Sequence, residues 1–229
     1  MSKRKVIGSM SEWLGGLKDL FRRNKEESAL RPAKAFVEHR IPLEERSIEE
    51  LIAEWEGFYQ DTFGIKTDFS NLQIPEKESG FNRLIIMAGG MTPQRLYDKC
   101  GEFFPCWKWT GDSLDNVVTY SERTSKNSAY AVWVRDCVEA DEEFKKLSAD
   151  KIKAKNINTE TLEEYFIHGL RYFRESRKHL DIRSVTVCAG SRLSDGTVPC
   201  VSGSGREVRI HPFPPGRSDG IHRSRRVVS

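Results

Sequence analysis

The stretch SVTVCAGSRLSDGTVPCVSGSGREVRIHPF, residues 184–213, decides the fold. It contains three short segments rich in β-branched residues, at 184–190, 197–203 and 207–213. A Ser-Asp-Gly turn joins the first two segments and a Gly-Ser-Gly turn joins the last two. Such turns reverse the chain because Asp bonds the backbone that follows it and Gly accepts a positive φ. The stretch therefore predicts an antiparallel meander of three strands.

Upstream of the meander, helix signals alternate with further strand signals. Ser47 and Thr161 are each followed three residues later by a glutamate, which is the pattern of a capping box at a helix N-terminus. Thr92 followed by Pro93 is a third helix start. Apolar or aromatic runs at 83–87, 106–110 and 130–136 are typical of strands.

These signals together predict an α+β fold with one mixed, largely antiparallel sheet of five or six strands covered by helices. We expect three parts along the chain. Residues 1–46 form an N-terminal amphipathic helix and a charged linker, residues 47–215 form the globular α+β domain, and residues 216–229 form a basic C-terminal tail.

Composition is typical of a soluble globular protein, since 38% of the 229 residues are hydrophobic and 31% are charged. No apolar run has the length of a transmembrane helix, and no apolar h-region follows the basic start MSKRKVIGSM. The five cysteines are an odd number without a CxxC pair, which favours reduced thiols. We therefore expect a cytoplasmic protein.

Charge is distributed unevenly along the chain although the net charge is only +3. Residues 42–165 carry a net charge of −9, whereas residues 166–229 carry +7 and eleven of their twelve basic side chains are arginines. Arginine suits bidentate contacts with phosphate or carboxylate. This asymmetry indicates an anionic partner, or basic ends that fold back and neutralise the acidic middle.

The candidate anion-binding residues follow from this arginine-rich end. Arginines close to Ser hydroxyls and turn amides suit a phosphate-bearing partner, and nucleic acid is the partner that such a basic end favours most. The set comprises Arg192, Ser194, Arg206, Arg209, Arg217, His222, Arg223, Arg225, Arg226 and, from an earlier strand, Lys108.

Two aromatic features have a structural and a functional interpretation. Trp107 and Trp109 share one side of their strand and could stack nucleic-acid bases next to Lys108, although burial in the core is the interpretation we favour. His168, within an aromatic helix, is more simply a packed histidine than a catalytic one.

An alternative function is protein–protein interaction through the N-terminal segment. Its apolar residues recur at helical spacing and would form one stripe that engages a partner or docks on the domain itself. These partner-binding candidates are Trp13, Leu14, Leu17, Leu20 and Phe21.

A third possibility is an enzyme that acts on a phosphorylated small molecule, with Arg192, Ser194, Asp195 and His211 as candidates. The chain has no GxSxG, HExxH, Rossmann or Walker A motif, so no catalytic residue and no cofactor is assigned. Cys188, Cys200 and His211 could ligate a metal, but their spacing matches no standard site, so no metal is assigned either.

Several segments resemble a group of uncharacterised proteins encoded by uncultured bacteria. They are GFNRLIIMAGG, FPCWKWT, YAVWVRDCVEADEE, KHLDIRSVTVCAGSRLSDGTVP and RSRRVVS. The resemblance extends over roughly residues 74–229 and implies a bacterial setting and a domain boundary, but no mechanism. The sequence thus favours a non-enzymatic binding module for an anionic partner, with nucleic acid first among the candidates.

Overall fold

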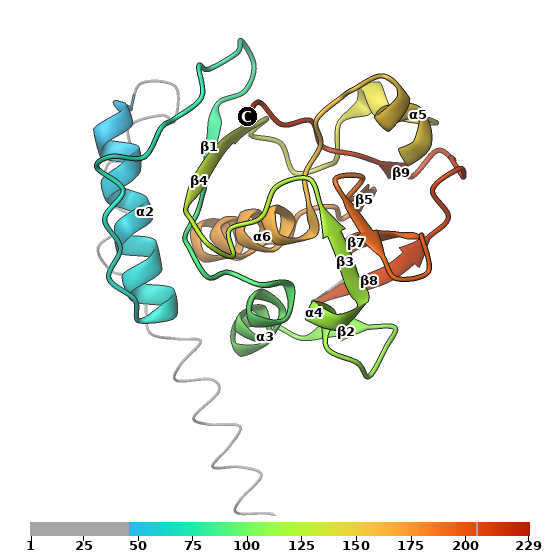
Figure 1. Cartoon of the computed structure of the whole chain (residues 1–229), viewed down its shortest axis with the longest axis horizontal. Helices are drawn as coiled ribbons and strands as arrows, with labels where there is room; N and C mark the ends of the chain where they lie inside the picture. The colour runs from blue at the N-terminus through green and yellow to red at the C-terminus, as the bar shows by residue number, and fades with distance from the viewer. Residues whose placement is uncertain (1–45, 205) are drawn as a thin grey trace, which may run out of the picture. The chain divides into compact units, whose positions relative to one another are not determined.

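The computed structural model of the protein describes residues 46–204 and 206–229, which form an α+β fold (Figure 1). The predicted N-terminal helix and its partner-binding residues lie outside this range. The helices are α2 (Ile48–Phe63), α3 (Pro93–Phe103), α4 (Leu114–Val117), the 3-10 helix η2 (Glu142–Phe144), α5 (Ala149–Ala154) and α6 (Leu162–Ser176). The strands are β1 (Arg83–Met87), β2 (Cys106–Lys108), β3 (Val118–Ser121), β4 (Tyr130–Val134), β5 (Val185–Val187), β6 (Ser191–Leu193), β7 (Val198–Ser204), β8 (Glu207–Phe213) and β9 (His222–Arg223).

The main sheet has five strands in the order β2-β8-β7-β5-β9. The predicted meander forms its centre, because β7 pairs antiparallel with both β8 and β5, while β2 and β9 add parallel strands at the two edges. The α+β class and the mixed sheet are therefore confirmed. The other strands form two separate antiparallel pairs, β1–β4 and β3–β6, so the sequence did not predict that the strands divide among three sheets.

Side chains of α2 explain why β1 does not extend the main sheet. The Trp55 Nε1–H donates to the carbonyl of Leu84 at 3.1 Å, and the Tyr59 hydroxyl donates to the carbonyl of Ile86 at 2.8 Å. The same hydroxyl accepts from the backbone N–H of Ala88 at 3.0 Å. The free edge of β1 is thus satisfied by a helix instead of another strand, which also protects it from pairing with other chains.

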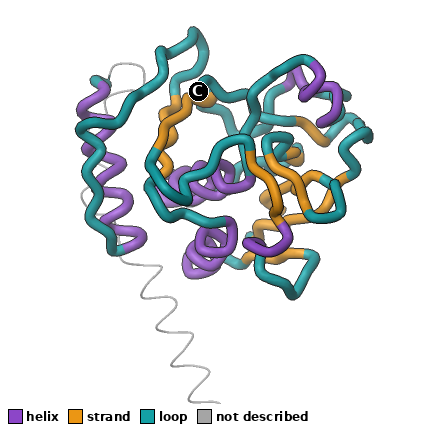
Figure 2. Tube along the Cα trace, in the orientation of Figure 1, coloured by secondary structure: helices purple, strands orange, loops and turns teal. Residues whose placement is uncertain are grey.

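The helix boundaries follow the caps read in the sequence. Ser47 and Thr161 both form complete capping boxes, and Thr92 accepts from the backbone N–H of Arg95. α2 ends at Gly64, whose φ of 68° is a left-handed conformation that glycine adopts without strain. The charged stretch after residue 139 is less helical than its composition indicates, since it forms only η2 and the short α5. Figure 2 shows the loops that separate these elements.

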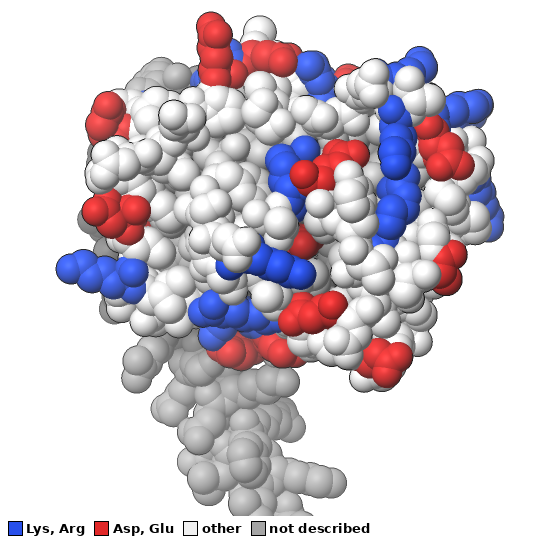
Figure 3. All heavy atoms as spheres, in the orientation of Figure 1, with Lys and Arg blue, Asp and Glu red and all other residues white. Residues whose placement is uncertain are grey.

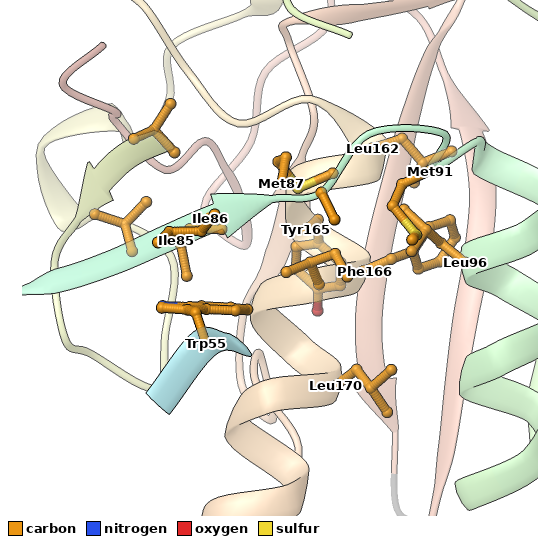
Figure 4. Packing of buried hydrophobic residues seen from close by; sticks show 14 of the residues in the cluster. Trp55, Ile85, Ile86, Met87, Met91, Leu96, Leu162, Tyr165, Phe166 and Leu170 are labelled. Atoms are coloured by element: carbon orange, nitrogen blue, oxygen red, sulfur yellow. The ribbon is translucent and has the colours of Figure 1, made fainter. Parts of the chain in front are cut away.

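The main hydrophobic core lies where α2, β1 and α6 meet (Figure 4). Trp55 of α2 lies beside Ile85 and Ile86 of β1, while Phe166 of α6 lies toward Leu96 of α3. A second, smaller cluster lies under α5, where Ile152 packs on Phe213 of β8. The second cluster covers only part of one face of the main sheet, and this leaves the rest of that face open.

The last residues of the chain, which the sequence predicts as a basic tail from residue 216, pair with strands of the domain. β9 pairs with β5, and the backbone of Val228 exchanges two hydrogen bonds with Trp133 of β4, each at 2.9 Å. Between them, the N–H of Glu160 donates to the carbonyl of Arg225 at 2.9 Å, and Val227 is buried. The buried Val227 and these backbone bonds fix the segment in place.

Gly203 of β7 provides a test of the packing between the main sheet and the segment after α6. A methyl group at position 203 would overlap the carbonyl oxygen of Leu180 and lie 2.6 Å from the Cβ of His179. We expect Gly203→Ala to lower the free energy of unfolding by about 1–3 kcal/mol, as overpacking does. Urea unfolding measures this. Gly57→Ala is the control, because α2 has open space there and alanine should be neutral or stabilising.

Candidate nucleic-acid interface

Arg225 is the most buried of the predicted anion-binding residues, with 2% of its surface exposed. Its guanidinium donates to Asp181 Oδ1 at 2.9 Å, to the carbonyls of Cys137 and Val138 at 3.0 and 2.6 Å, and to the Thr186 hydroxyl at 3.1 Å. Burial opposes the charge, but the negative charge of Asp181 raises the pKa of Arg225 above its ordinary value. Arg225 is therefore a structural residue and is removed from the set.

Arg223 and Arg226 are also engaged by carboxylates of the acidic middle of the chain. Arg223 pairs with Glu142, and Arg226 pairs with Glu78 at 2.9 Å while its guanidinium lies 5.0 Å from the centre of the Phe81 ring. For these residues the structure supports the second interpretation of the charge asymmetry, in which the basic end neutralises the acidic middle. They are weaker candidates for a partner than unpaired arginines.

Arg192 lies on β6, and Ser194 begins the turn that joins β6 to β7. Arg192 donates to the carbonyls of Ala189 and Ser191 at 2.7 and 2.8 Å. Its cross-strand neighbour is the exposed Tyr120 of β3, whose ring lies 5.9 Å from the Lys153 ammonium. Figure 3 shows basic side chains in a column on the face that carries β3 and α5. Ser194 is exposed, and its backbone N–H donates to the carbonyl of Val117 at 2.8 Å.

Asp195 serves the same turn. Its carboxylate accepts from the backbone N–H and the hydroxyl of Thr197 at 2.9 and 2.6 Å, and Gly196 follows with a φ of 83°. His211 lies instead on β8 and contacts Trp107. Within the described residues, no hydrogen bond joins Asp195 to His211, and the arrangement does not form a catalytic triad.

Three residues that the sequence analysis considered, Trp107, Arg209 and His211, lie together on the open face of the main sheet. Trp107 of β2 is 43% exposed, and its ring centre lies 4.9 Å from that of His211 at an angle of 42°. Arg209 is the cross-strand partner of Trp107, and its side chain is 49% exposed. We call Trp107, Arg209 and His211 the stacking face.

The alternation of side chains along β8 explains this placement. Val208 and Ile210 point into the main core, so Arg209 and His211 point to the opposite face of the sheet. Phe213 shares that face but is covered by the cluster under α5. The stacking face lies on the part of this sheet surface that the cluster under α5 does not cover.

The core interpretation of Trp107 is therefore wrong, whereas Trp109 does pack against the core. β2 ends at Lys108, so the strand alternation that would place both tryptophans on one side does not continue to Trp109. Lys108 points away from the stacking face, with its ammonium 5.6 Å from the centre of the Tyr97 ring and bonded to the carbonyl of Asp112. Lys108 is thus not part of this surface.

The ionisation of His211 suits stacking. Partial burial and the neighbouring positive charges of Arg209 and His222 lower its pKa, so the imidazole is neutral at pH 7. Arg209 retains one acidic neighbour, since its Nε lies 3.3 Å from Glu207 Oε1. Such an exposed pair contributes little energy and leaves the guanidinium accessible to a competing anion.

His222 and Arg217 border the covered end of β8. The His222 ring stacks on Phe213 with centres 4.1 Å apart, and the Arg217 guanidinium lies 5.6 Å from the same ring. His222 Nδ1 is 2.8 Å from Asp219. Burial would raise the pKa of Asp219, but hydrogen bonds from the backbone and ring of His222 lower it to about 2. Arg217 has no carboxylate within ion-pair distance in the part of the chain that the structure describes.

Cys188, Cys200 and His211, considered above as metal ligands, are not arranged as a metal site. Cys188 belongs to the main core and Cys200 to the cluster under α5, so their side chains lie on opposite faces of the sheet. Burial raises the pKa of the Cys200 thiol to about 12, and a thiol that stays protonated is a poor metal ligand. Among residues 46–204 and 206–229, no group of three or more potential ligands is arranged to hold a metal ion.

Within the same ranges, no helix is both long enough and apolar enough to cross a membrane. A comparison of the chain with protein-family models, curated proteins and solved structures found no match. The function is therefore inferred from the geometry of the site.

Proposed function

We propose that the protein binds single-stranded nucleic acid through the stacking face. The exposed Trp107 ring on an open sheet, in tilted contact with the His211 ring and next to Arg209, is the observation that carries the proposal. This retains the function that the sequence favours, but it changes the residues. Of the predicted arginines, the proposal retains the exposed Arg206, Arg209 and Arg217 and drops those that are buried or paired with carboxylates of the acidic middle.

The chemistry of the face matches the two needs of single-strand binding. Nucleic-acid bases stack on aromatic rings whatever their identity, and each stacked base is worth about 1–3 kcal/mol. Trp107 is held in place by His211 on one side, so little side-chain freedom is lost when a base binds on the other. Arg209, directly across the strand pair from Trp107, is placed to contact the phosphate next to a stacked base.

A duplex fits this surface poorly. Its bases are already stacked on one another and cannot lie on a flat aromatic ring without being flipped out, which costs a few kcal/mol per base. The open face also lacks a projecting helix that could enter a groove, because its residues come from β2 and β8. We therefore expect single strands to bind more tightly than duplexes of the same length.

Fluorescence anisotropy with labelled oligothymidylate tests the proposal. Trp107→Ala should weaken binding roughly 5- to 150-fold, the range that the loss of one stacked base implies. Arg209→Gln should weaken it less and should reduce the salt dependence of the affinity by about one phosphate contact. Stacking on Trp107 should also quench part of the tryptophan emission of the wild type.

Tyr120→Ala is the matched control, since Tyr120 is an equally exposed aromatic residue with a cation above its ring but lies on β3. The control should bind like the wild type. Loss of binding in Tyr120→Ala with full binding in Trp107→Ala would place the site at β3 and Arg192 and contradict the proposal. No binding by the wild type at low salt would remove nucleic acid as the partner.

A further inference from the structure

A group of basic residues surrounds the C-terminal end of α6. Arg174 lies in its last turn, Arg177 is its C-cap, Lys178 follows, and Arg206 lies in the turn between β7 and β8. We call these four residues the α6-end cluster. Counting the described residues only, none of the four has a carboxylate within 4.0 Å, unlike Arg171 one turn earlier, which pairs with Glu54 and Glu175.

Aromatic rings instead of carboxylates contact two of these residues, Arg174 and Arg177. The Arg174 guanidinium lies 5.2 Å from the centre of the Phe103 ring, and that of Arg177 lies 5.9 Å from Phe173. The His179 ring also stacks on the Phe173 ring, with ring centres 5.1 Å apart and an angle of 21° between the ring planes. Cation–π contacts orient a guanidinium without neutralising its charge, so the donors stay available for an anion.

The positive charges of the cluster are not balanced locally. Partial burial lowers the pKa of Arg174, and the charges of Arg177 and Arg171 lower it further against the opposing attraction of Asp61. Arg174 makes one side-chain hydrogen bond in the described structure, from Nη1 to the Thr62 hydroxyl at 3.3 Å. An anion that bound here would relieve the repulsion between neighbouring guanidinium groups.

The cluster is joined to the stacking face through the turn of the β7–β8 hairpin. His179 hydrogen-bonds the backbone of Arg206 and packs over Gly203 of β7. From Arg206 the chain continues directly into β8, where Arg209 follows three residues later, a span of about 10 Å in an extended strand. Because Gly203 pairs with the core-facing Val208, the cluster lies on the core side of the hairpin and the stacking face lies on the other side, so a strand that reached both would pass around the turn at Arg206.

Building on the proposed function, we propose that the bound single strand continues past the stacking face and that the α6-end cluster binds its phosphate backbone. The stacking face holds bases, while the cluster, whose rings are already covered by guanidinium groups, holds phosphates only. The site would then need a strand longer than the few nucleotides that Trp107 and His211 contact. Sites of about 4–16 nucleotides are usual for single-strand binding surfaces.

Anisotropy with two labelled oligothymidylates, of four and twelve nucleotides, tests this continuation. Arg177→Gln combined with Lys178→Gln should weaken binding of the 12-mer several-fold and reduce the slope of log K against log salt by about 1.4, because each phosphate contact contributes about 0.7 for a single strand. Binding of the 4-mer should be unchanged. Lys151→Gln combined with Lys155→Gln on and after α5 is the control, and it should bind both lengths like the wild type.

The outcomes separate the two proposals. If Trp107→Ala weakens both lengths while the Arg177 and Lys178 variant binds the 12-mer with wild-type affinity and salt slope, the continuation is wrong and the stacking face stands. If neither oligonucleotide binds the wild type at low salt, both proposals fail. Thermal unfolding of each variant shows whether a loss of binding comes from a loss of the fold.

Discussion

Replacing Asp181 with alanine is expected to lower the free energy of unfolding by about 3–5 kcal/mol, the usual cost of removing one partner of a buried ion pair. The Asp181 side chain is fully buried and pairs with Arg225, which is almost as buried. Without the carboxylate, the guanidinium would stay in the interior with its charge uncompensated, because its remaining contacts are neutral oxygens and a thiol.

Asp181 also satisfies neighbours other than Arg225. Its Oδ1 accepts from the backbone N–H of Ala140 at 2.8 Å and from the Ser184 hydroxyl at 2.9 Å, and its Oδ2 accepts from the Thr186 hydroxyl at 2.6 Å. Asp181 therefore joins the loop before β5 to the C-terminal segment and to the region that follows β4. Its loss should loosen the last residues of the chain together with β5.

Chemical unfolding of a short series measures the effect. Asp181→Asn keeps the shape and one of the two acceptor oxygens and tolerates the φ of 54° at this position, so its cost should be smaller than that of alanine. Removing both charges in Asp181→Asn with Arg225→Met should cost less than the sum of the single changes. Glu102→Ala, which removes an exposed partner of Lys99, is the control and should leave the midpoint unchanged. A cost of Asp181→Ala equal to that of the control would contradict the buried-pair account.

The Arg225 pair shows what sequence patterns cannot predict. Helix caps and turns depend on residues three or four positions apart, so Ser47, Thr92 and Thr161 predicted their elements correctly. Asp181 and Arg225 are 44 positions apart and meet only because β5 and β9 pair in parallel. Nothing local distinguishes Arg225 from the exposed Arg206, and a single sequence therefore treats all the arginines of the last third alike.

The site was predicted in part for a similar reason. Arg209 lies on a strand that the sequence identifies, and alternation with Val208 and Ile210 indicates that it points away from the core. The exposure of Trp107 depends instead on where the cluster under α5 stops, which is a tertiary property. The position of β2 at the edge of the main sheet is likewise known only from the strand order in the structure.

A dependence of stability on pH is expected from a second buried pair, Glu160 and His168. Both side chains are fully buried, and Glu160 Oε1 lies 2.8 Å from His168 Nδ1. Burial raises the pKa of Glu160 to about 8 and lowers that of His168 well below 6.5. At pH 7 the pair is therefore a protonated Glu160 carboxyl next to a neutral His168 imidazole. The two groups share the carboxyl proton and titrate as one pair.

The sign of the effect follows from proton counts in the folded and unfolded states. Above pH 4.5 the unfolded chain releases the Glu160 proton, whereas the folded protein keeps it up to about pH 8. Raising the pH through this window therefore favours unfolding, by up to about 1.4 kcal/mol per pH unit. His168 acts oppositely, because the unfolded chain takes up a proton below pH 6.5 that the folded protein does not. The pair thus contributes most stability between about pH 4.5 and 6.5 and loses it on either side.

Glu160→Gln should remove the alkaline part of this dependence. Glutamine has the shape of the protonated acid and can donate to His168 Nδ1, but it does not titrate. Between pH 6 and 8 the stability of the variant relative to the wild type should therefore rise by about 2–3 kcal/mol in urea unfolding at fixed salt.

Glu163→Gln is the matched comparison. Burial raises the pKa of Glu163 to about 7 only, so its relative gain should stop near that pH. A Glu160→Gln curve parallel to the wild type from pH 6 to 8 would show that Glu160 is ionised in the folded protein, with its charge balanced by the imidazolium or by Arg225.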